Sequence, residues 1–157
     1  TVESVYIRRL IMELWGYIGA AVCMGIAAIG SAIGIGIAGQ GAIGAWKRCY
    51  INNKPAPFIL TVFAGAPLTQ TIYGFLLMNI AMKPKVMSGE MTPGFALGLG
   101  IASGLAMCFS AIAQGKAGAA ASDALGETGK GFAQYIMVVG LCETVALFAM
   151  VFSMIVC

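Results

Sequence analysis

The sequence predicts an all-α membrane protein with four transmembrane helices, arranged as two duplicated antiparallel hairpins. Of its 157 residues, 60% are hydrophobic and 10% are charged, whereas a soluble domain usually carries about 25% charged residues. The charges are clustered, which leaves four apolar runs of the roughly 20 residues that a bilayer core of about 30 Å requires. Similar motifs also recur in the first and second halves of the chain.

The four apolar runs set the expected helices, and the polar stretches between them set the loops. The chain is then a single membrane domain over 1–157, with no room for a separate nucleotide-binding unit. The first and third helices exceed the bilayer thickness, so we expect them to tilt or to project into water. The expected helices are about 10–46, 56–82, 94–124 and 131–156, and they form hairpins over about 10–82 and 94–156.

The duplication is visible in two pairs of segments. Residues 31–39 of the first helix match residues 110–118 of the third, and residues 68–71 of the second match residues 141–144 of the fourth. Gln70 therefore stands where Glu143 stands in the second copy, as its neutral isostere. Residues equidistant from the turn of an antiparallel hairpin lie at one depth, so we expect Gln114 beside Glu143, with Gln70 at a similar depth.

Small residues dominate the first and third helices, whereas the second and fourth carry bulky Phe, Leu, Met and Ile. Glycines four residues apart let helix backbones approach closely. This contrast predicts a ring, with the first and third helices on a crowded inner circle and the other two against lipid. The pairs are Gly30 and Gly34, Gly94 and Gly98, and Gly100 and Gly104.

The charge-free run of the fourth helix is broken only by Glu143, near its middle. A carboxylate there costs about 2.5 kcal/mol or more unless it is neutralised or paired. No Lys or Arg is expected at the same depth, because Lys116 lies nearer the turn. Glu143 must then carry a proton, bind a metal cation or meet a cation on another chain. A permanently protonated acid, hydrogen-bonded to a neighbouring helix, is the alternative without an ion.

Neutral oxygens near the depth of Glu143 bear on the choice of ion. Thr69, Gln70 and Gln114 each offer one, and Pro67 distorts the second helix so that the backbone carbonyl of Ala66 can turn toward the site. One carboxylate with four neutral oxygens suits Na⁺, whereas Ca²⁺ and Mg²⁺ gather more carboxylates, waters or phosphates. A proton would need only the carboxylate and one partner. Without Glu143, the same side chains would be read as ordinary interhelical hydrogen bonds.

Tyr73 lies one turn after Thr69 and Gln70, and two interpretations of it stay open. Its hydroxyl can donate a hydrogen bond to the carboxylate of Glu143, or the ring can be an interfacial aromatic. The sequence contains no His, which excludes a His–Cys metal site and a His relay. It also shows no basic patch, so nucleic acid is not an expected partner.

These motifs resemble the membrane-ring proteolipid, known as the K or c component, of rotary V-type ATPases. The resemblance rests on residues 67–74, residues 109–116 and Glu143-Thr144, and the glycine run 34–39 is similar to the inner helix of the related F-type ring protein. It covers nearly the whole chain and is closest to the bacterial sodium-transporting branch. Ala66 and Leu68 depart from that branch, which matters little if only the backbone of residue 66 is used.

The resemblance implies a role for each residue of the predicted site. Glu143 would be the ion-carrying carboxylate, binding one Na⁺ per subunit, and Tyr73 would lock it in a closed rotamer. The chain itself would be a non-catalytic subunit of a sodium-translocating ATPase. The implied Na⁺ ligands are the side chains of Thr69, Gln70, Gln114 and Glu143 and the backbone carbonyl of Ala66.

The resemblance also implies partners and a location. Identical copies would form a closed ring in lipid, which turns against a stator membrane subunit with an essential Arg and carries the central stalk of a soluble ATPase. The location would be the cell membrane, most simply a prokaryotic plasma membrane, with several spans. A proton-carrying ring with the same Glu143 is the alternative. A small four-helix cation-coupled antiporter is less compatible, because it has no use for a duplicated glycine-rich hairpin.

Overall fold

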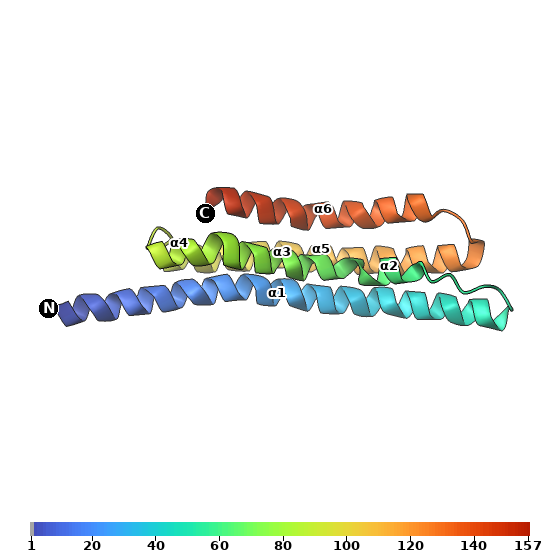
Figure 1. The fold of residues 1–157 in the computed structure, drawn as a ribbon, viewed down its shortest axis with the longest axis horizontal. Helices are drawn as coiled ribbons and strands as arrows, with labels where there is room; N and C mark the ends of the chain where they lie inside the picture. Colours follow the sequence, from blue (N-terminus) through green and yellow to red (C-terminus); the bar gives the residue numbers. More distant parts are fainter. Residues whose placement is uncertain (1) are drawn as a thin grey trace.

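A computed structural model describes residues 2–157, with side chains from Glu3 onward, and shows a bundle of four long helical rods. The rods lie lengthwise beside one another, and α1 begins at the end of the bundle where α6 finishes (Figure 1). The second rod consists of five short helices. The bounds are α1 Val2–Ile51; α2 Leu60–Gly65, η1 Ala66–Leu68, α3 Thr69–Leu76, η2 Leu77–Met82 and α4 Lys83–Ser88; α5 Pro93–Thr128; and α6 Phe132–Val156.

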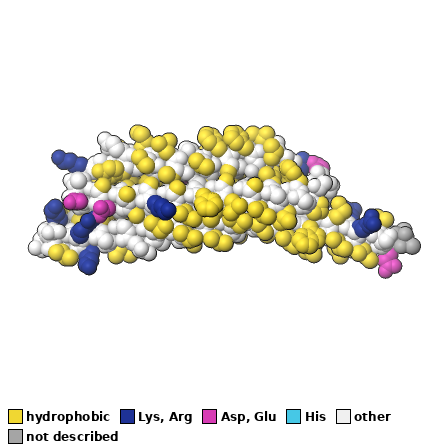
Figure 2. Space-filling model, turned by 180° about the vertical axis from the view of Figure 1, so that it is seen from behind, with side chains coloured by type: hydrophobic (Ala, Val, Ile, Leu, Met, Phe, Trp, Pro, Cys, Tyr) yellow, Lys and Arg dark blue, Asp and Glu magenta, His cyan; other side chains and the backbone are white. Residues whose placement is uncertain are grey.

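Four segments are long and apolar enough to cross a membrane, which confirms the predicted helical fold with four such helices. Apolar side chains cover the middle of the molecule in Figure 2, and most charged side chains gather toward its two ends. A contiguous apolar surface of this kind marks contact with lipid or with other protein. The segments are Glu3–Ile51, Leu60–Ser88, Pro93–Thr128 and Phe132–Val156.

The long helices α1 and α5 extend beyond the predicted ranges 10–46 and 94–124 at both ends. Hydropathy marks the part of a helix that suits lipid, but the backbone stays helical through its polar ends. Near the start of α1, Arg9 Nε donates to Glu13 Oε1 at 3.0 Å, an i to i+4 pair that supports an exposed helix. The left-handed backbone of Gly129, with φ of 66°, ends α5.

The second rod is displaced along the chain from its predicted range of 56–82. It begins at Leu60, because residues 52–59, which include Pro55 and Pro57, form turns and irregular backbone. It continues to Ser88, where Gly89 takes a left-handed conformation with φ of 77° and ends it. Most of the polar loop expected after residue 82 is therefore helical.

Two irregular turns interrupt the second rod on either side of α3. In the tight 3₁₀ turn η1, Pro67 lacks an N–H group, and the N–H of Thr69 bonds the carbonyl of Ala66 three residues back. In the wide π turn η2, the side chain of Asn79 donates to the carbonyl of Phe75 at 3.1 Å, four residues back. The short helix α3 is thus set between one overwound and one underwound turn.

The helices α1 and α5 run in the same direction, and their backbones touch. Gly30 lies against Cys108, and Gly34 lies against Gly115. A Cβ atom on Gly34 or Gly115 would overlap the facing backbone, so the close approach requires glycine. Gly36, the counterpart of Gly115 in the first repeat, faces open space. One face of α1 is therefore filled within the chain, and the opposite face is free.

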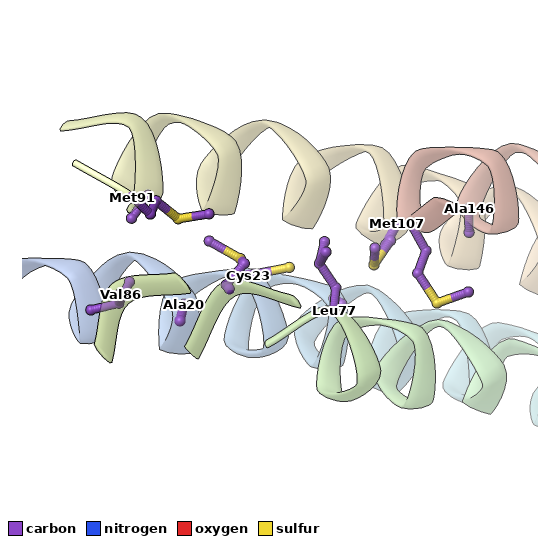
Figure 3. Packing of buried hydrophobic residues seen from close by; sticks show 11 residues of the cluster. Ala20, Cys23, Leu77, Val86, Met91, Met107 and Ala146 are labelled. Atoms are coloured by element: carbon purple, nitrogen blue, oxygen red, sulfur yellow. The ribbon is translucent and has the colours of Figure 1, made fainter. Parts of the chain in front are cut away.

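A core cluster joins all four rods on one side of the polar site. Cys23 of α1, Leu77 of η2, Met107 of α5 and Ala146 of α6 are buried together (Figure 3). Ala146 lies one turn after Glu143, so the packing that closes this cluster also holds the carboxylate-bearing part of α6 against the bundle.

Candidate cation-binding site

The short helix α3 presents its polar side chains toward α5 and α6. Gln70 is fully buried, whereas Thr69 and Tyr73 are partly buried. The hydroxyl of Thr69 lies 3.1 Å from the carbonyl oxygen of Ala66 and 3.3 Å from Gln70 Oε1. Three neutral oxygens therefore gather at the point where the 3₁₀ turn meets α3.

Gln114 of α5 and Glu143 of α6 meet at one depth, as predicted from their equal distance to the turn. Gln114 is fully buried, and its Nε2 donates to Glu143 Oε2 at 3.2 Å and to the carbonyl of Val139 at 3.2 Å. Glu143 lies 11 residues after Phe132, about 16 Å along α6. The carboxylate is thus close to the middle of this membrane-crossing segment.

The two carboxylate oxygens of Glu143 each accept a hydrogen bond. Tyr73 donates its hydroxyl to Oε1 at 2.6 Å, and Gln114 donates its amide to Oε2. The partners come from α3 and α5, so the carboxylate is held from two neighbouring rods. Of the two interpretations left open for Tyr73, the structure shows the hydrogen bond to Glu143.

A direct hydrogen bond links the neutral side chains on either side of the site. Gln70 Nε2 donates to Gln114 Oε1 at 2.9 Å, between two side chains with no exposed surface. Oxygens that bind one hard cation at about 2.4 Å lie roughly 3.4 Å apart, which is close to the spacing of the oxygens around Thr69. All five residues predicted for the site, together with Tyr73, therefore fall in one connected cluster.

No charge within the described part of the chain balances Glu143. Glu143 belongs to none of the three ion pairs that the described residues form, which are Arg9–Glu13, Arg48–Asp123 and Lys85–Glu90. Lys116 lies about 3 Å further along α5 than Gln114, toward the turn. It is exposed, however, so it points to another face of α5.

The prediction from sequence missed Ser110 and two backbone carbonyls. Ser110 is buried one turn before Gln114, donates to the carbonyl of Cys142 at 2.6 Å and lies 3.5 Å from Gln70 Nε2. The spacing of Ser110 and Gln114, four residues on one helix face, was the available signal. The carbonyl acceptors of Cys142 and Val139 left no signal in the side chains.

Comparison with known proteins finds matches over both hairpins. A family model for the C subunit of ATP synthase matches residues 97–156, the segment that contains Ser110, Gln114 and Glu143. A curated relative from Methanocaldococcus jannaschii, described as A-type ATP synthase subunit K, is 35% identical over 138 residues. The match covers 88% of this chain and 59% of the relative, so the chain spans about three fifths of that protein's length.

Proposed function

Because this chain belongs to the family of c and K proteolipids of rotary ATPases, we propose that it is an ion-carrying subunit of the membrane rotor of an A/V-type ATPase. The family is a non-catalytic membrane component of the complex, so ATP chemistry belongs to other subunits. Four apolar helices and this membership make the chain a multi-pass membrane protein. The observation that carries the proposal is Glu143 near the middle of α6, without an ion pair among residues 2–157.

The ion that we propose is Na⁺, one for each chain. The ligands are the side-chain oxygens of Thr69, Gln70, Gln114 and Glu143 and the backbone carbonyl of Ala66. No group of three His, Cys, Asp or Glu that could hold a metal occurs among the described residues. A single carboxylate neutralises a monovalent cation, whereas a divalent ion would leave a net charge in the membrane. A proton would need only the carboxylate and one hydrogen-bond partner, so the additional oxygens around Thr69 favour Na⁺.

Loading and release follow from charge balance. Glu143 with its cation is neutral, so it can face lipid while a ring of identical copies turns. A positively charged Arg on a stator protein would compete for the carboxylate and release the ion. Tyr73 would hold the loaded carboxylate by its hydroxyl. The turning ring would be coupled to ATP through the stalk of a soluble complex, which adds no residue to this site.

A proton as the transported ion is the second candidate, and one observation favours it. Both oxygens of Glu143 already have a donor, from Tyr73 and Gln114, and Gln114 Oε1 already accepts from Gln70. A proton on Oε1 requires only that the Tyr73 hydroxyl turn, so that it accepts from the carboxyl group instead of donating to it. Binding of Na⁺ by Gln114 Oε1 requires the Gln114 amide to turn.

Carbodiimide labelling of Glu143 in the assembled complex separates these two ions. A carbodiimide reacts with the protonated carboxyl, so a bound cation blocks the reaction. We expect millimolar Na⁺ to protect Glu143 at constant pH and K⁺ at equal concentration to give no protection. Labelling that depends on pH alone would refute Na⁺ and support the proton. Absence of labelling at Glu143 under every condition would contradict its role as the carrier.

A further inference from the structure

Ser110 occupies a buried position between the two halves of the site. It belongs to α5, and its hydroxyl contacts Gln70 of α3 and the backbone of α6 at Cys142. Only 5% of its surface is exposed, so these contacts are largely shielded from solvent. Ser110 is not among the ligands proposed for the cation. Its place in the hydrogen-bond network therefore needs a separate explanation.

The direction of the Ser110 hydrogen bonds is determined by its partners. The carbonyl oxygen of Cys142, 2.6 Å away, can only accept, so the one hydroxyl proton of Ser110 points to it. The Ser110 oxygen then presents only lone pairs to Gln70. The group of Gln70 that lies 3.5 Å away is its amide nitrogen, which is the donor that such an oxygen requires.

The amide of Gln70 is held in one orientation by two acceptors. One N–H points to Gln114 Oε1 at 2.9 Å, and the other points to Ser110. Gln114 cannot easily reverse in the cation-free site, because its own nitrogen faces two acceptors, Val139 and Glu143. With both N–H groups placed, Gln70 Oε1 is directed toward the hydroxyl of Thr69, 3.3 Å away. If the Gln70 amide were reversed, its oxygen would face two other acceptors, Ser110 Oγ and Gln114 Oε1.

We infer that Ser110 is a positioning residue of the cation site, which keeps the Gln70 oxygen on the side of Thr69 and Ala66. Its importance rises when Na⁺ is bound, because Gln114 must then turn its oxygen to the ion and Ser110 remains as the acceptor for Gln70. This inference rests on the proposed function. It predicts that loss of the hydroxyl weakens Na⁺ binding and leaves protonation of Glu143 unchanged, since a proton uses no oxygen of Gln70.

The first repeat supplies a matched control. Ser31 is the counterpart of Ser110, is equally buried and accepts a hydrogen bond from the backbone N–H of Thr71 at 3.2 Å. The first repeat has no carboxylate at the position that corresponds to Glu143, because Gln70 stands there. Removal of the Ser31 hydroxyl thus costs one buried hydrogen bond to the backbone of α3 and leaves both acceptors of the Gln70 amide in place.

The experiment measures carbodiimide labelling of Glu143 in assembled complexes, against Na⁺ concentration and separately against pH without Na⁺. For Ser110→Ala we expect half-protection to need roughly tenfold more Na⁺, with an unchanged pH profile. Ser110→Thr, which keeps the hydroxyl, should restore the Na⁺ response, and Ser31→Ala should match the unaltered chain. If Ser110→Ala does not assemble, Ser110→Cys replaces it with a weaker acceptor and the same expected direction.

Four results would overturn the inference. Equal Na⁺ responses of Ser110→Ala and the unaltered chain would show that Ser110 does not position Gln70. A joint shift of the Na⁺ and pH responses would indicate a general structural defect, as would the same shift in Ser31→Ala. An unaltered chain whose labelling ignores Na⁺ would instead refute the proposed function, and this inference with it.

Discussion

The two hairpins of this chain share a plan but differ in chemistry at matched positions. Where the second repeat has Gln114 and Glu143, the first has Ile35 and Gln70. The serine of the motif is kept in both, as Ser31 and Ser110, and each makes a hydrogen bond to the neighbouring helix. The same helical scaffold therefore carries a complete polar site in one repeat and an incomplete one in the other.

The difference shows how a duplicated site can be turned into a single one. Gln70 has lost the charge of its counterpart, yet it remains fully buried and bonds Gln114 of the other repeat. In the site that we propose, the position that could have carried a second ion instead contributes a neutral oxygen to the first. Since each chain then carries one ion for two hairpins, we expect fewer ions moved per ATP, a ratio that suits pumping over synthesis. A measured ratio of one ion per hairpin would refute that expectation.

The largest effect is expected from Glu143→Gln, which gives the second repeat the amide of the first. It should abolish ion transport, at least 100-fold, because a neutral amide cannot exchange a cation or proton. Assembly should persist, since Gln70 shows that an amide fits the matched position. Transport in reconstituted vesicles and the yield of assembled complex measure the two properties. Glu127→Gln, at the exposed end of α5, is the control, and transport that survives in Glu143→Gln would refute the carrier role.

The second prediction concerns Gln114, which the substitution Gln114→Ile replaces with the residue of its first-repeat counterpart, Ile35. Gln114→Ile removes the hydrogen bonds to Glu143, Val139 and Gln70. It also removes the oxygen that we propose as a Na⁺ ligand, and at about 1.5 to 3 kcal/mol for one interaction with a charged group the Na⁺ affinity should fall roughly 10- to 150-fold. The Na⁺ concentration for half-protection of Glu143 measures the change. An affinity unchanged by Gln114→Ile would mean that the site is formed by η1, α3 and α6 alone.

The third prediction compares two glycines that the duplication relates. A Cβ at Gly115 overlaps the backbone of Gly34, so Gly115→Ala should destabilise the folded chain by about 3 kcal/mol. Its counterpart Gly36 faces open space, so Gly36→Ala should leave the fold of the single chain intact. If a ring forms, the free face of α1 receives the next copy, and Gly36→Ala should lower the yield of rings.

Thermal unfolding in detergent and native mass spectrometry of the oligomer separate the two effects. Gly44→Ala, further along α1 and also facing open space, tests whether any added methyl on this helix disturbs assembly. Gly36→Ala that assembles as well as the unaltered chain would place the contact between copies on another face. Equal unfolding temperatures for Gly115→Ala and Gly36→Ala would contradict the close approach of α1 and α5.

The sequence was sufficient for the four apolar helices and for the six predicted residues of the cluster, because both depend on patterns that repeat along the chain, but the prediction omitted Ser110. The depth of Gln114 and Glu143 followed from their distances to the turn, and the structure shows them bonded. The helix ends were predicted less well, since polar ends stay helical outside the apolar run. The π turn over Leu77–Met82 was not predicted, because no local residue pattern marks it.

The smallest effect is expected at the connection between the repeats, where the turn from α4 to α5 carries an exposed ion pair. Hydrogen bonds from Lys85 and Ser88 hold the pKa of Glu90 below its ordinary value. A lowered pKa means that the folded state favours the ionised carboxyl. The stabilisation is therefore present at neutral pH and is lost as the pH falls through the lowered pKa of the folded chain.

Glu90→Gln should accordingly lower the unfolding temperature slightly at neutral pH, and the difference should vanish in acid and shrink in high salt. The described residues of the connection between α5 and α6 form no such pair, so Glu127→Gln, near that turn, is the control for the loss of an exposed charge. Unfolding temperatures of both variants across pH measure this contrast. A Glu90→Gln effect that persists at pH values where the carboxyl is protonated would show that its shape, and not its charge, stabilises the turn.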